Sequence, residues 1–268
     1  MEISESRINN RYAIASVEKW LDLDLGSLEK YYRELINDKQ LLAIISHSIS
    51  VSKNYKEDIP RLFNRTPIKN VDWYGLQRIL LYCFVRLFKP EIVLETGVYY
   101  GGNSVFILAG LQRNKKGKLI AIDYPQNRMN EVALGLRHPW VGESEVYKEK
   151  YKPGFIIPEL LRDRLELIIG DSLIVLPTIS SKIDLFVHDS EHTLLHVLAE
   201  LNLVWDKLLD EGIAFVDDID WSNGFYSFTT ANNLYPLLLT DNGKDNLRIR
   251  TGLIKKNHRF NNLLGITK

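Results

Sequence analysis

The fold is decided by residues 92–109, which read IVLETGVYYGGNSVFILA. The apolar run Ile92–Leu94 ends in Glu95 and breaks into a glycine-rich turn, after which helix-compatible sequence resumes at Ser104. A strand, a tight loop and a helix start in this order offer backbone N–H groups and the positive end of a helix dipole to a ligand. The stretch therefore predicts one βα unit of an α/β fold with a ligand site at its loop.

The glycine spacing of this loop argues against two common phosphate-binding motifs. A dinucleotide fingerprint needs Gly-x-Gly-x-x-Gly, and aligning Gly97 and Gly102 with it puts Tyr99 where the second glycine should be. No Gly-Lys-Ser/Thr follows, so a P-loop does not fit either. What remains is acid-x-Gly-x-x-x-Gly-x-x-Ser, which resembles the first motif of class I S-adenosylmethionine-dependent methyltransferases. The alternative is an ordinary strand-to-helix turn in another α/β protein.

Composition limits the class of protein and its partners. The 268 residues suffice for one sizeable α/β domain with a helical appendage. Lys+Arg and Asp+Glu are 34 each, so no long-range field attracts nucleic acid or an anionic membrane. The single cysteine, Cys83, excludes an intrachain disulfide and a cysteine-rich zinc site. With a polar start and apolar runs too short to span a bilayer, we expect a cytoplasmic protein.

Two parts of the chain differ in their periodicity. Apolar residues recur at helical spacing from about residue 14 to residue 65, without a catalytic constellation. We therefore expect residues 1–75 to form a helical cap or oligomerisation segment, which makes a homodimer plausible. An apolar helix is expected over Leu76–Phe88, closed by Lys89-Pro90, and it opens the second part, residues 76–268.

From Glu91 onward, short β-branched runs alternate with helical ones. Near-continuous apolar strands separated by helices indicate a mostly parallel, doubly wound sheet with helices on both faces. A late run, residues 247–254, is expected to add an antiparallel strand. The expected strands are Ile92–Glu95, Leu119–Asp123, Leu165–Ile169, Ile183–His188 and Ile213–Asp217, and the expected helices are Ser104–Gln112, Pro158–Arg164, Ser172–Ile179 and Thr193–Leu209.

The segment 125–151 does not follow this alternation. It mixes polar and aromatic residues, among them Arg128, His138 and Trp140. A long insertion at the ligand edge of an α/β sheet is usually a lid or a substrate loop, although a surface excursion fits the sequence equally well.

Polar residues at three strand ends suit a nucleoside cofactor. Asp123 closes the second strand, where a carboxylate can accept two hydrogen bonds from a ribose diol, in adenosylmethionine and in NAD alike. Asp171 and Ser172 follow the third strand and suit an adenine ring, but either is also a good helix N-cap. Glu95 ends an apolar strand, where a carboxylate is costly unless it is paired, and the methionine ammonium is a natural partner.

The next two strands end in a cluster of acids. Asp189 follows the fourth strand, and Asp217 with Asp218 follows the fifth, so adjacent strand ends bring three carboxylates toward one point. Such groups repel unless they hold protons or a cation, and oxygen ligands suit Mg²⁺. His192, three residues after Asp189, fits a general base. Alternatively, the acids cap helices or form a solvated turn.

The resemblance becomes more specific here. The run His188-Asp189-Ser190-x-His192-Thr193 and the Asp217-Asp218 pair resemble the methyltransferases that include macrocin-type sugar O-methyltransferases and cephalosporin-hydroxylase-like proteins. The likeness covers roughly residues 91–228, although Asp217 stands where several relatives carry Glu, and it implies a seven-stranded Rossmann-like sheet. It also implies Mg²⁺ on Asp189, Asp217 and Asp218, His192 as the base with Asp189 beside it, and a sugar or natural-product hydroxyl as the methyl acceptor. The implied S-adenosylmethionine site comprises Glu95, Thr96, Gly97, Tyr99, Gly101, Ser104, Asp123, Asp171, Ser172 and Asp189.

Three other functions stay open at this point. A methyltransferase without a metal would use the acids to bind an amine or to cap helices. An NAD-dependent oxidoreductase is disfavoured by Tyr99 in place of a glycine. A non-catalytic cofactor-binding protein of the same fold is opposed by the acids and His192.

Overall fold

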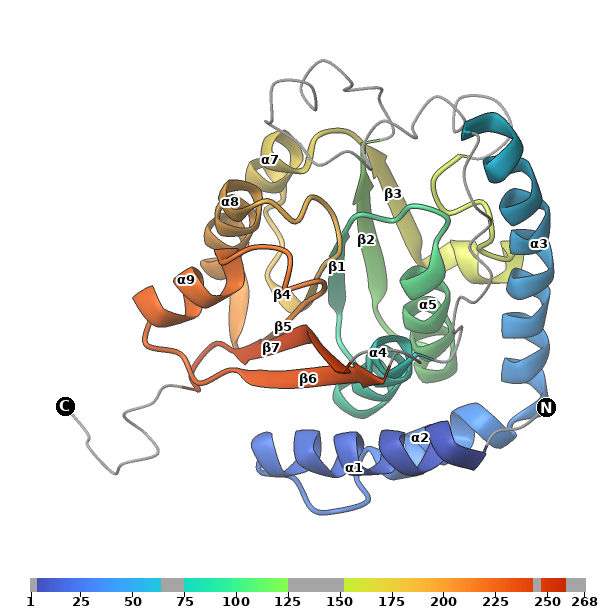
Figure 1. The fold of residues 1–268 in the computed structure, drawn as a ribbon, viewed down its shortest axis with the longest axis horizontal. Helices are drawn as coiled ribbons and strands as arrows, with labels where there is room; N and C mark the ends of the chain where they lie inside the picture. The colour runs from blue at the N-terminus through green and yellow to red at the C-terminus, as the bar shows by residue number, and fades with distance from the viewer. Residues whose placement is uncertain (1–3, 64–74, 125–151, 243–246, 259–268) are drawn as a thin grey trace.

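The computed structural model describes residues 4–63, 75–124, 152–242 and 247–258, and the expected lid at 125–151 lies outside them (Figure 1). The strands are β1 (Ile92–Thr96), β2 (Lys118–Asp123), β3 (Leu165–Ile169), β4 (Ile183–His188), β5 (Leu208–Val216), β6 (Leu237–Asn242) and β7 (Leu247–Lys255). The helices are α1 (Ser4–Trp20), α2 (Glu29–Asn37), α3 (Lys39–Phe63), α4 (Leu76–Phe88), α5 (Gly102–Asn114), α7 (Ser172–Val175), α8 (Leu194–Trp205) and α9 (Gly224–Ala231), with 3₁₀ helices η2 (Glu159–Arg164) and η3 (Leu176–Thr178).

The strands form one seven-stranded sheet in the order β3-β2-β1-β4-β5-β7-β6. The first five strands run parallel, and β7 pairs antiparallel with both β5 and β6. This confirms the doubly wound, mostly parallel sheet and the antiparallel late strand. The order reverses between β1 and β4, and ligands in such sheets bind beyond the carboxyl ends of the strands at this point.

Several expected boundaries need correction. The fifth strand begins at Leu208, so the helix before it ends at Trp205 and not at Leu209. The segment expected to be helical near 158–164 is the 3₁₀ helix η2, and the expected helix 172–179 divides into α7 and η3. The strand β6 was not predicted, because its leucines carry no β-branched signal and its place follows from pairing with β7.

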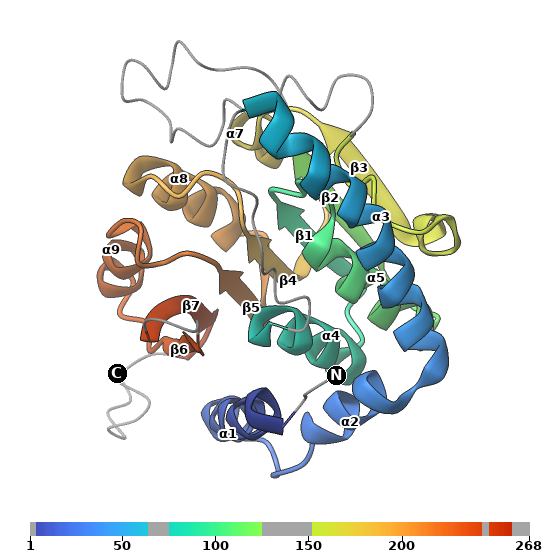
Figure 2. The ribbon, with the colours of Figure 1, turned by 45° about the vertical axis from the view of Figure 1, so that its right-hand side comes forward.

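Alternation along each strand sends neighbouring residues to opposite faces of the sheet. Val93 packs in the hydrophobic cluster that contains α4 and α5, whereas Leu94 packs in the cluster that contains α8 and α9. Figure 2 shows these two helical layers on opposite sides of the sheet. The same alternation divides the polar residues at the strand ends between the two faces.

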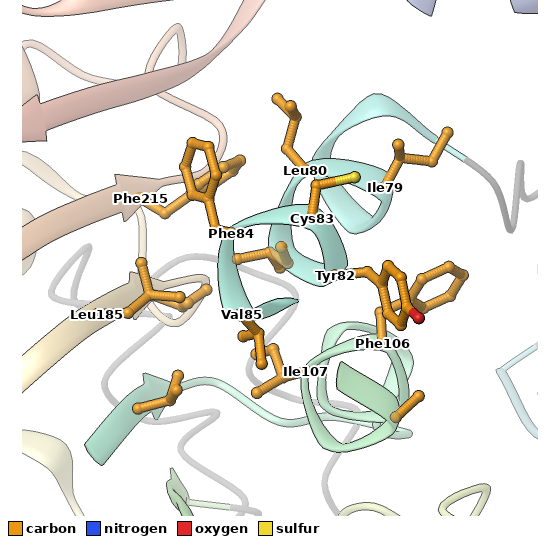
Figure 3. Packing of buried hydrophobic residues seen from close by; sticks show 14 of the residues in the cluster. Ile79, Leu80, Tyr82, Cys83, Phe84, Val85, Phe106, Ile107, Leu185 and Phe215 are labelled. Carbon is orange, nitrogen blue, oxygen red and sulfur yellow. The ribbon is translucent and has the colours of Figure 1, made fainter. Parts of the chain in front are cut away.

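Helix α4 is the centre of the first layer. Its residues Ile79–Val85 are all buried, between the sheet and the N-terminal helices (Figure 3). Phe84 meets Phe215 of β5 edge to face, with ring centroids 6.2 Å apart. Cys83 lies in this apolar setting, and burial raises the pKa of its thiol, so it packs as a small hydrophobe.

The N-terminal helices belong to the same core. Tyr32 and Leu35 of α2 are buried in the cluster that contains α4. Glu34 accepts from the Arg86 Nε at 2.7 Å, which joins α2 to α4. Trp20 Nε1 donates to the carbonyl of Tyr235 at 3.2 Å, which joins α1 to the chain just before β6. The helices α1 and α2 therefore pack directly against the core that α4 centres. Among the described helices, none has the length and hydropathy needed to cross a membrane.

Candidate active site

The loop after β1 passes very close to the loop after β4. Gly97 has a φ of +83°, and a Cβ at this residue would lie 2.0 Å from the backbone oxygen of Asp189. The Gly97 N–H donates to the carbonyl of Ile122 at 2.9 Å. Glycine is required both by the left-handed backbone and by this close approach. The loop thereby holds the carboxyl ends of β1, β2 and β4 together.

Asp123, at the end of β2, holds the next part of the loop. Its Oδ2 accepts from the N–H groups of Val98 at 2.8 Å and Tyr99 at 2.6 Å. Tyr99 has a φ of +50°, so it takes a left-handed conformation that usually favours glycine. Burial raises the pKa of Asp123 to about 6, although the backbone N–H groups that it accepts oppose the rise. The loop ends at Gly101, the N-cap of α5, which has a φ of +102°.

Glu95 lies fully buried between the sheet and α5. Its Oε2 accepts from the Ser104 hydroxyl at 2.5 Å, and its Oε1 has no hydrogen-bond partner among the residues that the structure describes. Burial raises the pKa of Glu95 to about 8, and the charge of Asp123 adds to the rise. A buried carboxylate oxygen without a donor is costly, so this atom is suited to a cationic or N–H group of a ligand.

Asp171 and Ser172 have structural contacts of their own. Asp171 Oδ1 accepts from the Leu173 N–H at 2.9 Å and so caps α7. The Ser172 hydroxyl lies 3.2 Å from Nε2 of His196 on α8. Capping is therefore a documented role of Asp171, and its contact with a cofactor stays a prediction, as does that of Ser172.

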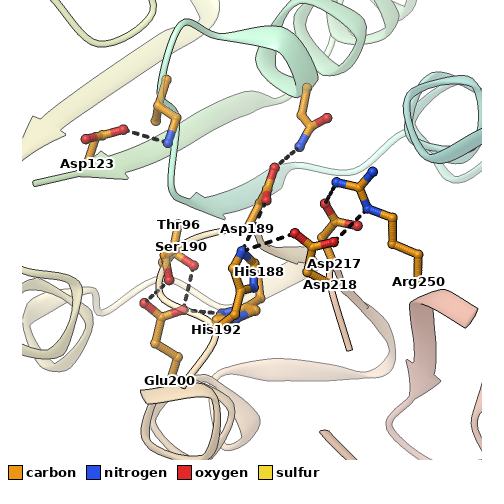
Figure 4. A network of polar contacts seen from close by, with 12 residues as sticks. Thr96, Asp123, His188, Asp189, Ser190, His192, Glu200, Asp217, Asp218 and Arg250 are labelled. Atoms are coloured by element: carbon orange, nitrogen blue, oxygen red, sulfur yellow. Dashed lines mark hydrogen bonds and ion pairs between the residues drawn. The ribbon is translucent and has the colours of Figure 1, made fainter. Parts of the chain in front are cut away.

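The structure brings the four residues of the expected reaction site together (Figure 4). Nε2 of His192 lies 3.9 Å from Asp189 Oδ1 and 3.8 Å from Asp218 Oδ2. Asp217 is 3 % exposed, and it lies close enough to Asp189 for the two carboxyl groups to interact. Burial and the charges of Asp217 and Asp218 raise the pKa of Asp189 well above its usual range, and burial raises that of Asp217.

Four residues of this site were missed by sequence reasoning. Asn103 donates to Asp189 Oδ2 at 2.8 Å. The Gln77 amide, oriented to donate, lies 3.0 Å from Asp217 Oδ1. The remaining two residues are arginines. The charge of Arg78 lowers the pKa of Asp217, and its guanidinium donates to the Tyr100 hydroxyl at 2.8 Å. Arg250 forms ion pairs with Asp217 and Asp218.

Only weak signals could have revealed these four residues. Asn103 lies inside the glycine-rich turn, and Arg250 alternates with apolar residues in an expected strand. Gln77 and Arg78 lie in the first turn of an apolar helix, where polar residues are ordinary.

On the opposite face of the sheet, a second cluster surrounds Glu200 of α8. Its Oε2 is 2.6 Å from both the Thr96 hydroxyl and His188 Nδ1, and its Oε1 is 2.9 Å from both the Ser190 hydroxyl and His196 Nε2. Burial by itself raises the pKa of Glu200, but the two histidines hold it well below its usual range. Thr96 was expected to contact the cofactor, and the structure shows it tying β1 to α8.

No set of three His, Cys, Asp or Glu side chains stands ready to hold a metal ion in the part of the chain that the structure describes. The acids Asp189, Asp217 and Asp218 are nevertheless neighbours, and the cation that the last two contact is the guanidinium of Arg250.

Comparison with known proteins assigns this region. Residues 94–219, which include the loop after β1, Asp189, His192 and the Asp217-Asp218 pair, match the family model of a methyltransferase domain. In these residues the chain is therefore similar to a methyltransferase domain. No curated protein matches the sequence significantly. The family match favours the methyltransferase over the NAD-dependent oxidoreductase, which Asp123 alone left open.

Solved structures with the same fold extend beyond the methyltransferase domain. An O-methyltransferase from Bacillus cereus, in complex with SAH, superposes with a TM-score of 0.54 and 12% identity, over 85% of this chain and 100% of that chain. The O-methyltransferase TomG from Streptomyces achromogenes, involved in tomaymycin synthesis and solved in complex with SAM, superposes with a TM-score of 0.50 and 14% identity, over 78% and 96%. At these identities the likeness concerns the fold.

Proposed function

We propose that the protein is an S-adenosylmethionine-dependent O-methyltransferase that methylates a hydroxyl of a sugar or natural-product small molecule. The observation that carries the proposal is the placement of His192 within 4 Å of both Asp189 and Asp218, beside the cofactor loop. The acceptor class is also that of the resembled family, and TomG, which shares the fold, is an O-methyltransferase involved in tomaymycin synthesis. Balanced charge supports neither nucleic acid nor an anionic membrane as partner. A cytoplasmic location and a homodimer complete the proposal.

The cofactor site uses the residues at the ends of β1 and β2. S-adenosylmethionine supplies an electrophilic methyl group when it is bound. Glu95 Oε1, which is buried and accepts from no described residue, is suited to the ammonium of the methionine part. Asp123 is suited to the ribose diol, while it keeps Val98 and Tyr99 in place. Glycine at residues 97 and 101 permits the left-handed backbone of the cofactor loop. The proposed site is completed by Tyr99, Ser104, Asp171, Ser172 and Asp189.

The acids fit a divalent cation by their chemistry. Asp189, Asp217 and Asp218 supply carboxylate oxygens, which Mg²⁺ prefers, and their mutual proximity raises the pKa of Asp189. When bound, Mg²⁺ would lower the pKa of an acceptor hydroxyl. Asn103 and Gln77 orient Asp189 and Asp217, respectively.

His192 is proposed to take the proton of the acceptor hydroxyl at Nε2, the nitrogen that faces Asp189 and Asp218. The two carboxylates stabilise the imidazolium that results. The Trp221 indole, 38% exposed, lies 5.5 Å from the His192 ring and offers an apolar face to the acceptor. The remaining contribution is positioning of the acceptor oxygen in line with the methyl group, which is worth on the order of 7–11 kcal/mol in favourable cases.

The first test is calorimetric titration with S-adenosylhomocysteine, with and without Mg²⁺, on the wild type and Asp217→Ala. Micromolar binding to both proteins is expected, because Asp217 belongs to the reaction site and not to the cofactor site. Absence of binding to the wild type would overturn the proposal.

The second test is an acceptor screen with Mg²⁺ present. His192→Ala is expected to lose turnover by two to four orders of magnitude while it keeps its cofactor affinity. His47→Ala, an exposed histidine on α3, is the matched control and should keep full activity. Unchanged turnover in His192→Ala would reject the base assignment, and full activity in the presence of EDTA would reject the metal.

A further inference from the structure

The acidic pair at the end of β5 already contacts a cation of the chain itself. The Arg250 Nε lies 2.7 Å from Asp218 Oδ1, and its Nη2 lies 3.4 Å from Asp217 Oδ2 (Figure 4). One guanidinium therefore engages two of the three carboxylates that the resemblance assigns to a metal. Arginine stays protonated throughout the working pH range, so this positive charge is permanent.

Strand pairing fixes the backbone of Arg250 beside the acids. In the antiparallel pair of β5 and β7, Val216 lies opposite Gly252. The Ile219 N–H then donates to the Arg250 carbonyl at 3.0 Å, which extends the pairing past Asp217 and Asp218. Because the ladder continues to this residue, Arg250 is held in place from its backbone.

The side chain of Arg250 lies on the solvent side of the acids. It is 38% exposed, whereas the side chains of Asp217 and Asp218 are 3% and 11% exposed. A long, partly exposed side chain can turn toward water once its ion pairs break, and its flexible stem makes such rotation fast. The acids, in contrast, are held between α4 and the loop after β4. The mobile partner of the ion pair is therefore the arginine.

We propose that Arg250 is the counter-ion of Asp217 and Asp218 in the metal-free protein and competes with the divalent cation for these two acids. This inference rests on the proposed function. A carboxylate oxygen engaged by a guanidinium at 2.7 Å cannot also bind a metal ion in the same position. The cation thus enters only as the arginine turns outward, and Arg250 sets the metal affinity of the protein. Its charge also balances part of the negative charge of the two acids while no metal ion is bound.

The test is titration with Mn²⁺ alone, by calorimetry and by electron paramagnetic resonance of the free ion. Wild type, Arg250→Gln and Arg250→Lys are compared. We expect Arg250→Gln to bind Mn²⁺ at least tenfold more tightly, because the competing charge is gone. Arg250→Lys should fall between the two, because it keeps the charge but loses the fork that engages both acids. Equal or weaker binding by Arg250→Gln would overturn the proposal.

Lys255→Gln is the matched control, since it removes a positive charge from the same strand, at a residue paired with Glu211. Its Mn²⁺ affinity should stay within twofold of the wild type. Titration of each sample with S-adenosylhomocysteine reports whether the variant is folded. If the wild type and Arg250→Gln bind Mn²⁺ equally and turnover still depends on Mg²⁺, only the role of Arg250 is rejected. If neither the wild type nor Arg250→Gln binds Mn²⁺, the role of Arg250 and the proposed metal site are both rejected. Binding of S-adenosylhomocysteine would then still support the methyltransferase.

Discussion

The last two residues of β1, Glu95 and Thr96, point into two different buried clusters, and each cluster contains a glutamate. The pKa of the glutamate is raised in one cluster and lowered in the other. Thr96 points to the α8 face, where the Glu200 carboxylate has four hydrogen-bond partners, two on each oxygen. Glu95 points to the α5 face, where the Ser104 hydroxyl donates to one oxygen and no group in the described part of the chain donates to the other. Burial acts on both carboxyl groups, yet the pKa of Glu200 is lowered and that of Glu95 is raised to about 8.

This contrast separates a structural group from a ligand-binding one. A saturated buried carboxylate stabilises the fold because every partner would otherwise be left unpaired. A carboxylate with an unmet oxygen lowers stability until a ligand arrives. Changes around Glu200 should therefore appear in the free energy of unfolding, and changes around Glu95 in ligand binding and in the pH dependence of stability.

The largest expected effect is that of Glu200→Ala. The substitution removes the common partner of His188 and His196 and frees the hydroxyls of Thr96 and Ser190. We expect the free energy of unfolding to fall by about 4 kcal/mol, within the range for a broken buried ion pair. Urea denaturation followed by circular dichroism measures it.

The control for this change lies on the same helix. Asn202→Ala, an exposed residue of α8, should change the free energy of unfolding by less than about 0.5 kcal/mol. A loss of stability in Glu200→Ala no larger than that of Asn202→Ala would refute the structural role of the cluster.

The second effect tests the point where the two clusters approach each other. Gly97→Ala places a Cβ 2.0 Å from the Asp189 carbonyl, in a backbone conformation that alanine rarely adopts. The loop after β4, which carries Ser190 toward Glu200, must then move. We expect a loss of about 3 kcal/mol in the free energy of unfolding, together with weaker cofactor binding.

Gly26→Ala is the control that separates the backbone strain of a left-handed alanine from the steric clash expected in Gly97→Ala. Gly26 has a φ of +91°, and a Cβ there would meet nothing within 4 Å. It should cost only the strain, about 1–2 kcal/mol. Equal losses for the two variants would show that the contact with Asp189 is unimportant.

The third effect is a change in the pH dependence of stability. The folded-state pKa of Glu95 is about 8, above its ordinary value of 4.5, so the folded protein binds the extra proton between these pH values. Stability therefore falls as pH rises through this window, by at most about 1.4 kcal/mol per pH unit. Glu95→Gln should remove the contribution of Glu95 to this fall and leave that of Asp123, whose pKa is also raised, so the fall becomes smaller, most clearly between about pH 7 and about pH 8, as measured by urea denaturation across the window.

Glu95→Gln should also weaken S-adenosylhomocysteine binding by tenfold or more, because the proposed partner of the ammonium is lost. Glu91→Gln, an exposed glutamate just before β1, should follow the wild type in both measurements. A wild-type stability that stays level from about pH 5 to about pH 8 would contradict the raised pKa.

The smallest effect is that of Ser104→Ala. The Ser104 hydroxyl donates to Glu95 and opposes the rise in its pKa. Its loss should cost about 1 kcal/mol of unfolding free energy. The deficit should grow as pH passes about 8, because the hydrogen bond favours the ionised carboxylate. Ser48→Ala, a buried serine whose hydroxyl donates to a backbone carbonyl, should show a deficit that does not vary with pH. A pH-independent deficit in Ser104→Ala would separate this serine from the titration of Glu95.

The sequence predicted those features of the structure that depend on residues adjacent in the chain. Apolar runs that end in Glu95, Asp123 and Asp189 predicted both the parallel strands and the edge at which these acids lie, because strand and acid are adjacent in the chain. The expected capping by Asp171 was likewise a local property, and the structure confirms it.

Contacts between distant segments could not be predicted in this way. Glu200 lies 104 residues from Thr96, and Arg250 lies 33 residues from Asp217. Which side chains meet across such distances depends on strand order and helix packing, and a single sequence specifies neither directly. The acidic cluster was therefore predicted without the arginine that neutralises part of its charge.

The contact between Trp20 and Tyr235 has a consequence for biosynthesis. The two residues are 215 positions apart, and Trp20 donates its indole N–H across that separation. During translation, the first helix leaves the ribosome long before the segment that completes its burial exists. Val17 and Trp20, buried in the finished protein, must stay exposed or find temporary cover until then. The order of synthesis thus makes this protein a candidate client for chaperones that bind nascent chains.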